Sequence, residues 1–242
     1  MTPSAPFYAL GEHFAVDLDG ARVVFTTRRG GFSSGPYESL NLGRLTADRP
    51  EDVKRNRAAL KEQLGVQLAY IRQVHGTKVR RVVVAPVDPA DGVELPECDG
   101  QATALPNVAP MVMTADCLPV AVAGRGAVAM LHAGWRGLAA GILEEGAAAL
   151  RELAGEQELH ALIGPGAGPC CYEVGAEVHA ALGGTPRRGP IDLAGIAARR
   201  LRAAGVGEVR ALDVCTICDR RFFSHRREGE RAGRQAGVAW LS

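Results

Sequence analysis

Three residues of types that bind transition metals, His75, Cys117 and His132, each lie at the end of a run typical of a β-strand. Imidazole nitrogen and thiolate sulfur are preferred zinc ligands, and three protein ligands leave a fourth position for water or substrate, as catalytic zinc sites do. A second chemistry fits the same residue types, with Cys117 as a thiolate nucleophile that His132 activates. The residues alone leave these two alternatives open.

Copper oxidation is a third alternative, and the supply of histidines argues against it. A multi-copper centre needs on the order of ten histidines, arranged largely as His-x-His pairs. The chain has six histidines, and none belongs to such a pair. We therefore expect about one zinc ion per chain and little copper.

A predicted β-hairpin should bring Cys117 and His132 together. Two apolar runs, 118–123 and 127–131, flank Gly124-Arg125-Gly126 and favour two strands joined at the glycines. Because Cys117 and His132 are nearly equidistant from this turn, they should face each other at the open end of the hairpin. Asp116 precedes Cys117 and could orient an imidazole ligand.

The segment after His132 predicts a place for an anion. Residues 133–137 are too rich in glycine for a regular element, and helical spacing of apolar residues follows over 138–153. A junction between strand and helix presents backbone N–H groups, and Arg136 would add a planar cation beside them.

Other patterns predict the surrounding elements. Strands are expected over 22–27, 68–74, 81–85 and 160–163, and helices over about 49–65, after the capping-box pattern Asp48–Glu51, and over 192–204 with Asp192 as N-cap. Arg28 follows the first strand in a glycine-rich loop and could reach a ligand. Asn41, between two leucines, is typical of a turn or of a satisfied polar group in the core.

The other cysteines predict no metal site. The adjacent Cys170 and Cys171 cannot readily chelate one ion together and favour buried, small apolar positions. Cys215-x-x-Cys218 resembles half of a zinc ribbon, but no second Cys-x-x-Cys exists to complete it. We therefore expect every cysteine except Cys117 to be dispensable for metal binding.

Composition limits the classes of function. The chain has 242 residues, 47% of them hydrophobic, and a net charge of +1 from 28 basic and 27 acidic residues. This balance predicts no nucleic-acid partner and no anionic membrane. No apolar stretch approaches the roughly 18 to 20 uncharged residues of a membrane span, the N-terminus shows no leader pattern, and the cysteines are sparse. We therefore expect a cytoplasmic protein with one domain over 1–242.

Four motifs resemble the signatures of the YfiH/YlmD family, long labelled a polyphenol oxidase (laccase) domain and related to the mammalian protein FAMIN. They are Gln73-Val74-His75-Gly76, Thr114-Ala115-Asp116-Cys117-Leu118-Pro119-Val120, His132-Ala133-Gly134-Trp135-Arg136-Gly137 and Ile163-Gly164-Pro165 with Cys170-Cys171-Tyr172. The likeness runs from about Thr26 to the C-terminus. Where the family usually has Thr-Gly-Arg, this chain has Ala232-Gly233-Arg234 and lacks one hydroxyl.

The resemblance implies a zinc-dependent enzyme of purine nucleosides. Its activities would be phosphorolysis of adenosine, inosine and methylthioadenosine, and deamination of adenosine. The implied zinc ligands and catalytic residues are His75, Cys117 and His132. The substrate-binding candidates are Arg28, Asn41, Arg136, Phe223 and Arg226, of which the arginines suit phosphate and Phe223 suits a ring.

The resemblance also implies an α/β (α+β) fold, a layered α/β/β/α sandwich with mixed sheets, similar to the catalytic domain of cytotoxic necrotizing factor. Expected partners are small molecules, namely purine nucleosides and phosphate, and the protein would be a monomer or homodimer. Alternatives are a cysteine-dependent amide hydrolase acting on a peptidoglycan precursor, a copper polyphenol oxidase, and a non-catalytic, zinc-stabilised binding module.

Overall fold

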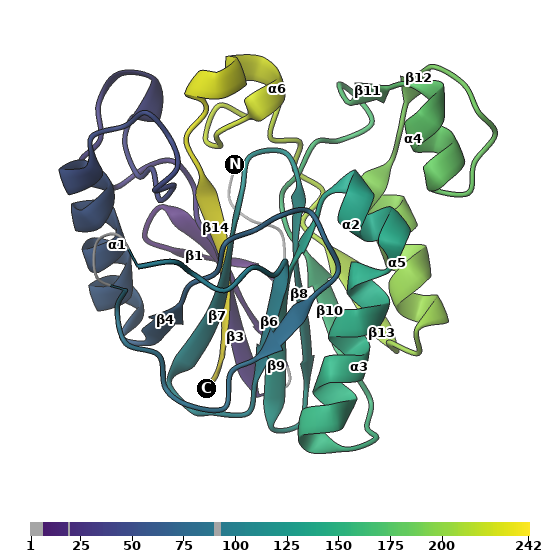
Figure 1. Ribbon diagram of the computed structural model, residues 1–242, viewed down its shortest axis with the longest axis horizontal. Coiled ribbons are helices and arrows are strands. Elements are labelled where there is room, and N and C mark those ends of the chain that lie inside the picture. Colours follow the sequence, from purple (N-terminus) through teal and green to yellow (C-terminus); the bar gives the residue numbers. More distant parts are fainter. Residues whose placement is uncertain (1–6, 19, 90–92) are drawn as a thin grey trace.

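Two six-stranded mixed sheets pack face to face, with helices on both outer faces (Figure 1). The computed structural model describes residues 7–18, 20–89 and 93–242. In Figure 1, α1 covers the outer face of one sheet, and α3 and α5 lie on the opposite side of the molecule. This arrangement is the predicted α/β/β/α layering, and the fold class is confirmed.

The first sheet joins the two ends of the chain. Its strands, in spatial order, are β1 (Tyr8–Leu10), β2 (His13–Leu18), β3 (Ala21–Phe25), β14 (Gln235–Leu241), β7 (Val108–Thr114) and β4 (Gln67–Ala69). All neighbours are antiparallel except β4 and β7. The C-terminal strand β14 therefore lies inside the sheet, between β3 and β7.

The second sheet carries most of the candidate site. Its strands, in spatial order, are β13 (Glu208–Ala211), β10 (His160–Ile163), β8 (Leu118–Gly124), β9 (Ala127–Ala133), β6 (Gly100–Thr103) and β5 (Val79–Arg81). β10 and β13 are parallel, as are β5 and β6, and the other pairs are antiparallel. A separate two-stranded ribbon consists of β11 (Glu173–Val174) and β12 (Gly189–Pro190).

The helices are mostly short. They are α1 (Pro50–Leu64), α2 (Trp135–Ala140), α3 (Ile142–Ala154), α4 (Ala176–Ala181), α5 (Leu193–Ala203) and α6 (His225–Glu228), with single 3₁₀ turns at Gly35–Tyr37 and Gly229–Arg231. As predicted, the Asp192 side chain caps α5 by accepting a hydrogen bond from the Gly195 N–H.

The alternation of side chains along the strands divides the core into three layers. In β3, Val23 and Phe25 point into the layer between the sheets, whereas Val24 points outward to the layer that contains Leu60 of α1. The third layer lies between the second sheet and the helices α3 and α5, and it contains Leu131. These layers hold β8 and β9 rigidly, because every residue of both strands is buried.

The predicted hairpin is confirmed, with longer strands than the sequence indicated. Pro119 pairs with His132 and Leu118 with Ala133, so the ladder continues through His132. Cys117 immediately precedes β8 and lies at the same end of the hairpin. The predicted strands over 160–163 and 22–27 also form, the second one over Ala21–Phe25.

Two predicted helices were wrong in detail. The helix over 138–153 is two helices, because Gly141 adopts φ 106° between α2 and α3, and α2 begins inside the glycine-rich segment, at Trp135. Asp48 is not the cap of α1; the N-cap is Arg49, and Asp48 accepts hydrogen bonds from Ser33 and Asn41 instead.

The strands expected over 68–74 and 81–85 are also shorter or displaced, over Gln67–Ala69 and Val79–Arg81. Beyond β4, the backbone N–H groups of residues 74–76 donate to Asp99 and take part in no strand ladder. Among the described helices, none combines the length and the apolar content that a membrane span requires.

Candidate metal centre

His75, Cys117 and His132 come together at the open end of the β8–β9 hairpin. Their potential ligand atoms all lie within 4.8 Å of one another, and the two imidazole rings meet edge to face with centroids 4.8 Å apart. Cys117 Sγ is 3.9 Å from His75 Nε2. His132 is buried, Cys117 is partly exposed and His75 is exposed, so the cluster is open to solvent on one side.

Asp99, directly before β6, positions both histidines. Its carboxylate accepts hydrogen bonds from the backbone N–H groups of Val74, His75 and Gly76, at 3.1, 2.9 and 2.6 Å. Three convergent amides hold His75 at φ 62°, a left-handed conformation that a histidine rarely adopts without such support. The same carboxylate accepts a 2.8 Å hydrogen bond from His132 Nδ1.

This contact fixes the tautomer of His132. With Nδ1–H donating to Asp99, the lone pair of a neutral imidazole is on Nε2, where it can bind a metal. Burial opposes ionisation of Asp99, but the hydrogen bonds from His132 and the backbone amides outweigh it and lower the pKa of the carboxyl group. Asp99 is therefore a carboxylate that fixes the orientation of the imidazole.

The thiol of Cys117 is set up to ionise. Burial raises its pKa, but the charge of His132 and hydrogen bonds with both histidines have the larger, opposite effect. The net result is a pKa lowered to about 6. Burial likewise lowers the pKa of His132, and attraction to Cys117 and Asp99 raises it to about 9. Without a metal, the pair is a thiolate and an imidazolium; a metal ion would replace the proton on Nε2.

Two backbone features bring the chain close to the cluster. Asp116 has φ 90°, and Gly134 faces the ligands across a narrow gap. A Cβ atom on Gly134 would lie 3.0 Å from Cys117 Sγ and 3.0 Å from His75 Cδ2. This close approach favours glycine, because a side chain would crowd the sulfur and the imidazole.

Asp116 does not orient an imidazole, contrary to the prediction. Its carboxylate accepts hydrogen bonds from Thr216 Oγ1 at 2.6 Å, Ser224 Oγ at 3.1 Å and the Arg226 N–H at 2.6 Å. It therefore attaches the C-terminal segment to the site, and Asp99 has the role that was expected of Asp116. The acidic residue before a glycine in Asp99-Gly100, at the start of a strand, was the available signal.

Arg226 and Tyr172 form one wall near the cluster. The Arg226 guanidinium lies 4.9 Å from the centre of the Tyr172 ring and donates to the Glu173 carbonyl at 3.1 Å. Burial, and next the charge of Cys117, raise the pKa of Tyr172, so its phenol stays protonated. Tyr172 belongs to one of the family motifs, but only the folded structure brings it near enough to Cys117 for the two to interact electrostatically.

Arg136 is exposed and lies over the Trp135 ring at 4.4 Å. It is in the first turn of α2, two residues after Gly134, which contacts the cluster. The cation is thus on a helix, not in the loop that the sequence predicted, and it remains available to a ligand.

Asn41 and Phe223 are fully buried and have structural contacts. Asn41 donates to Thr46 and Asp48 and accepts the N–H groups of Gly43 and Arg234, so all of its hydrogen-bonding capacity is used. Phe223 is 0% exposed. Both side chains are enclosed by the protein in this conformation, and their contact with substrate stays a prediction.

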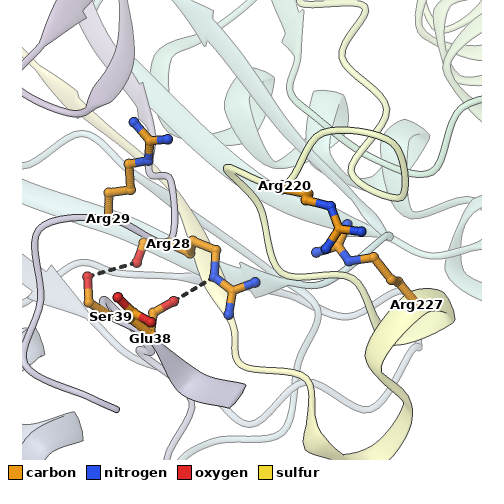
Figure 2. Close-up of a pocket in the computed structure, with 6 residues that line it drawn as sticks. All are labelled: Arg28, Arg29, Glu38, Ser39, Arg220 and Arg227. Carbon is orange, nitrogen blue, oxygen red and sulfur yellow. Dashed lines mark hydrogen bonds between the residues drawn. The ribbon is translucent and has the colours of Figure 1, made fainter. Parts of the chain in front are cut away.

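Arg28 faces a different pocket from the metal-binding cluster. Figure 2 shows this pocket, of about 330 Å³, which is lined by Arg28, Arg29, Glu38, Ser39, Arg220 and Arg227. The Arg28 guanidinium donates to the carbonyls of Glu38 and Pro36 and to the Glu228 carboxylate, and it lies over the Phe223 ring. These contacts make Arg28 a link between the N-terminal loop and the C-terminal segment.

The prediction for the adjacent cysteines Cys170 and Cys171 was also wrong. Cys170 is exposed and Cys171 partly exposed, so they are not buried apolar residues as predicted. Both lie with Cys215 and Cys218 in a second cluster whose sulfur atoms are within 4.8 Å of one another. Cys170 and Cys171, which are neighbours in the chain, thus occupy the place that a second Cys-x-x-Cys has in a zinc ribbon.

Comparison with known proteins agrees with the fold and the motifs. The family model described as "Multi-copper polyphenol oxidoreductase laccase" matches residues 22–242. A purine nucleoside phosphorylase of Xylella fastidiosa is 40% identical over 245 residues, which cover 92% of this chain and 93% of that protein. The purine nucleoside phosphorylase YfiH of Escherichia coli is 34% identical, covering 92% and 94%. The crystal structure of YlmD from Geobacillus stearothermophilus is similar with a TM-score of 0.87 and 30% identity, covering 96% of each chain.

The fold and the site thus define a layered α/β/β/α protein with a cysteine and two histidines at the open end of a central hairpin. The chain belongs to the YfiH/YlmD family of laccase-domain proteins.

Proposed function

We propose that this protein is a zinc-dependent purine nucleoside enzyme. Its reactions are phosphorolysis of adenosine, inosine and methylthioadenosine, and deamination of adenosine. The names of its relatives support the substrate class. The observation that carries the proposal is the cluster of His75, Cys117 and His132, open on one side and fixed from behind by Asp99.

The donor set suits zinc. One thiolate and two imidazoles make a borderline-soft set that zinc accepts, and three protein ligands leave the fourth tetrahedral position for water or substrate. When bound, zinc would supply Lewis acidity and an activated water. Cys117 contributes a thiolate because its pKa is lowered to about 6, and Asp99 keeps His132 Nε2 directed at the metal position.

The surrounding residues divide the remaining tasks. The protonated Tyr172 phenol can donate a hydrogen bond to a nucleoside near Cys117, and Arg226, held by Asp116 and stacked on Tyr172, lies beside it. Phosphorolysis also needs a cation that holds phosphate near the anomeric carbon. Arg136 is the candidate, because it lies two residues after Gly134, which contacts the cluster, and its exposed guanidinium can bind two phosphate oxygens.

Cysteine-dependent amide hydrolysis is the second candidate, and one observation favours it. Cys117, His132 and Asp99 form a chain in which a carboxylate orients an imidazole that is paired with a thiolate. This is the arrangement of a nucleophile, a base and an orienting acid. Such a hydrolase would act on an amide such as that of a peptidoglycan precursor, and it would tolerate removal of metal.

Copper oxidation has the least support, despite the description of the family model. The six histidines of the chain include only His75 and His132 in the cluster, and none forms a His-x-His pair. A multi-copper centre requires several more imidazoles than this set supplies. We therefore propose zinc and not copper at this centre.

A substrate screen separates the candidates. Purified protein is assayed with adenosine, inosine and methylthioadenosine, each with and without phosphate and after treatment with a chelator, and the products are separated by chromatography. Phosphate-dependent release of the free base, lost with chelator and restored by zinc, is the expected result. Amide hydrolysis that survives chelation would favour the cysteine hydrolase, and dioxygen consumption with a phenol would favour the oxidase.

A further inference from the structure

Two loops bring four cysteines together beyond the C-terminal ends of two neighbouring strands in the second sheet. Cys170 and Cys171 follow β10, and Cys215 and Cys218 follow β13. Because β10 and β13 are parallel neighbours, their C-terminal ends lie at the same edge. A backbone bridge continues the pairing beyond the strands, where the Thr216 N–H donates to the Gly166 carbonyl at 2.9 Å and the Gly166 N–H to the Val214 carbonyl at 3.2 Å.

The spacing of the sulfur atoms suits one tetrahedral ion. All four Sγ atoms lie within 4.8 Å of one another, with 3.5 Å between Cys170 and Cys218 and 2.9 Å between Cys171 and Cys218. A Zn–S bond of about 2.3 Å places the sulfurs of a tetrahedral site about 3.8 Å apart. Shifts of about an ångström or less in flexible side chains would produce that geometry.

The backbone around the cluster is shaped for thiolates. The turn at Gly168 folds Cys171 and Tyr172 back, because both of their N–H groups donate to the Gly168 carbonyl, at 3.1 and 2.9 Å. The Gly168 N–H itself donates to Cys215 Sγ at 3.2 Å. Amide donors directed at a sulfur are the outer contacts that a metal-bound thiolate requires.

We propose that Cys170, Cys171, Cys215 and Cys218 form a structural zinc site, separate from the centre at Cys117. Four thiolates close the coordination sphere and leave no position for a substrate, which is typical of structural and not catalytic zinc. A disulfide between Cys171 and Cys218 is the competing arrangement, but it would use only two of the four sulfurs. The proposal does not rest on the proposed function.

The site would hold in place two chain segments near the Cys117 centre. Tyr172 directly follows Cys171, and Thr216 lies between Cys215 and Cys218 and donates to Asp116, the residue before Cys117. An ion that joins the two loops would therefore hold Tyr172 and the Asp116 contacts in place. This proposal replaces the expectation that these four cysteines are dispensable for metal.

Elemental analysis of the full chain tests the proposal. Protein is purified with a reductant and without chelator, as wild type and as the variants Cys117→Ala, Cys171→Ser/Cys218→Ser and Cys98→Ala. Cys98 is a buried cysteine outside both clusters and serves as the matched control. We expect about two zinc ions per chain in wild type and Cys98→Ala, and about one in each of the other two. If wild-type protein holds about one zinc ion and Cys117→Ala holds none, the proposal is wrong.

A second measurement identifies the ligands without depending on the double variant, which could fail to fold. X-ray absorption at the zinc edge of Cys117→Ala protein should show four sulfur neighbours at about 2.3 Å. Cobalt(II) in the same protein should give strong thiolate-to-metal charge transfer and the visible bands of a tetrahedral site. Iron or copper in place of zinc, nitrogen or oxygen neighbours, or a disulfide in the intact mass of the alkylated protein would each overturn the proposal.

Discussion

The two cysteine-containing clusters differ in the features that separate a reactive centre from a structural one. Cys117 meets two imidazoles at the end of a fully buried hairpin, with a carboxylate behind them and one side open. The other cluster has four sulfurs, two of them on exposed residues, and joins two loops. The neighbours of a cysteine thus decide which kind of metal site it could form. One thiol and two imidazoles on a rigid sheet leave a fourth coordination position open, whereas four thiols would fill all four positions.

The largest expected effect separates the two clusters by activity. Cys117→Ala should lower both phosphorolysis and deamination at least about a thousandfold, because it removes a ligand of the proposed catalytic zinc. Zinc at the four-cysteine cluster should be retained. Chromatographic rate assays on metal-quantified protein test this, with Cys98→Ala as control. Activity within a few fold of wild type would contradict the assignment of Cys117.

Asp99→Asn should affect the Cys117 centre and not the four-cysteine cluster, because only the Cys117 centre has a carboxylate that accepts a hydrogen bond from an imidazole ligand. The variant should lower zinc affinity or activity about 10–100-fold. Zinc competition with a chromophoric chelator measures the affinity. Asp192→Ala, which removes the cap of α5 at a cost of about 1 kcal/mol in stability, is a structural control that should leave zinc affinity unchanged. An equal loss of zinc affinity in both variants would mean that Asp99 acts only through the stability of the fold.

In the metal-free protein, the two ionised groups of the Cys117 centre should each make a pH-dependent contribution to stability. Burial opposes both charges, but the thiolate–imidazolium attraction lowers the pKa of Cys117 to about 6 and raises that of His132 to about 9. The lowered pKa stabilises the fold above the ordinary thiol pKa, and that stabilisation is lost as the pH falls through about 6. The raised pKa stabilises the fold below the ordinary imidazole pKa, and that stabilisation is lost as the pH rises through about 9.

The two contributions change in opposite directions with pH, so their sum stays nearly constant in wild-type protein in chelator. Cys117→Ala keeps only the contribution of His132, so its thermal midpoint should fall increasingly below that of wild type as the pH rises above about 6. Differential scanning fluorimetry across the pH range measures the difference. A difference that does not change with pH would mean that the pair is not ionised in the metal-free protein.

The smallest expected effect concerns phosphate. Arg136→Lys keeps the charge but loses the planar pair of donors, so phosphorolysis should fall about tenfold while zinc content and thermal midpoint stay near wild type. Deamination consumes no phosphate and is the internal control. Equal loss of both activities would mean that Arg136 positions the nucleoside, and unchanged rates would remove it from the site.

The sequence predicted the central hairpin and the gathering of Cys117 and His132, because apolar runs on both sides of a glycine turn are a local signal. His75 was included because it also lies at a predicted strand end, whereas the α/β/β/α layering came from the resemblance to a family. Asp99 was missed because its role depends on amides that are more than twenty residues away in the chain. The burial of Asn41 was one of the two roles that its position between leucines indicated, whereas the burial of Phe223 depends on tertiary packing that spacing does not encode.

The four-cysteine cluster was missed for a related physical reason. Its two halves are 44 residues apart between Cys171 and Cys215, and only the parallel pairing of β10 and β13 brings them together. A search for a repeated Cys-x-x-Cys fails because one half is an adjacent pair. The break at Gly141 was a similar failure, since the apolar spacing continues across a glycine whose positive φ ends one helix and starts another.

Zinc at the Cys117 centre should be needed for phosphate-dependent cleavage of a nucleoside. The decisive measurement is the rate of hypoxanthine release from inosine in phosphate, before removal of zinc, after removal, and after zinc is returned, with Cys117→Ala protein alongside. We predict that the rate collapses on removal and recovers with zinc in the wild type, and that it does not recover in Cys117→Ala. An unchanged rate in zinc-free protein, or equal release without phosphate, would contradict the account.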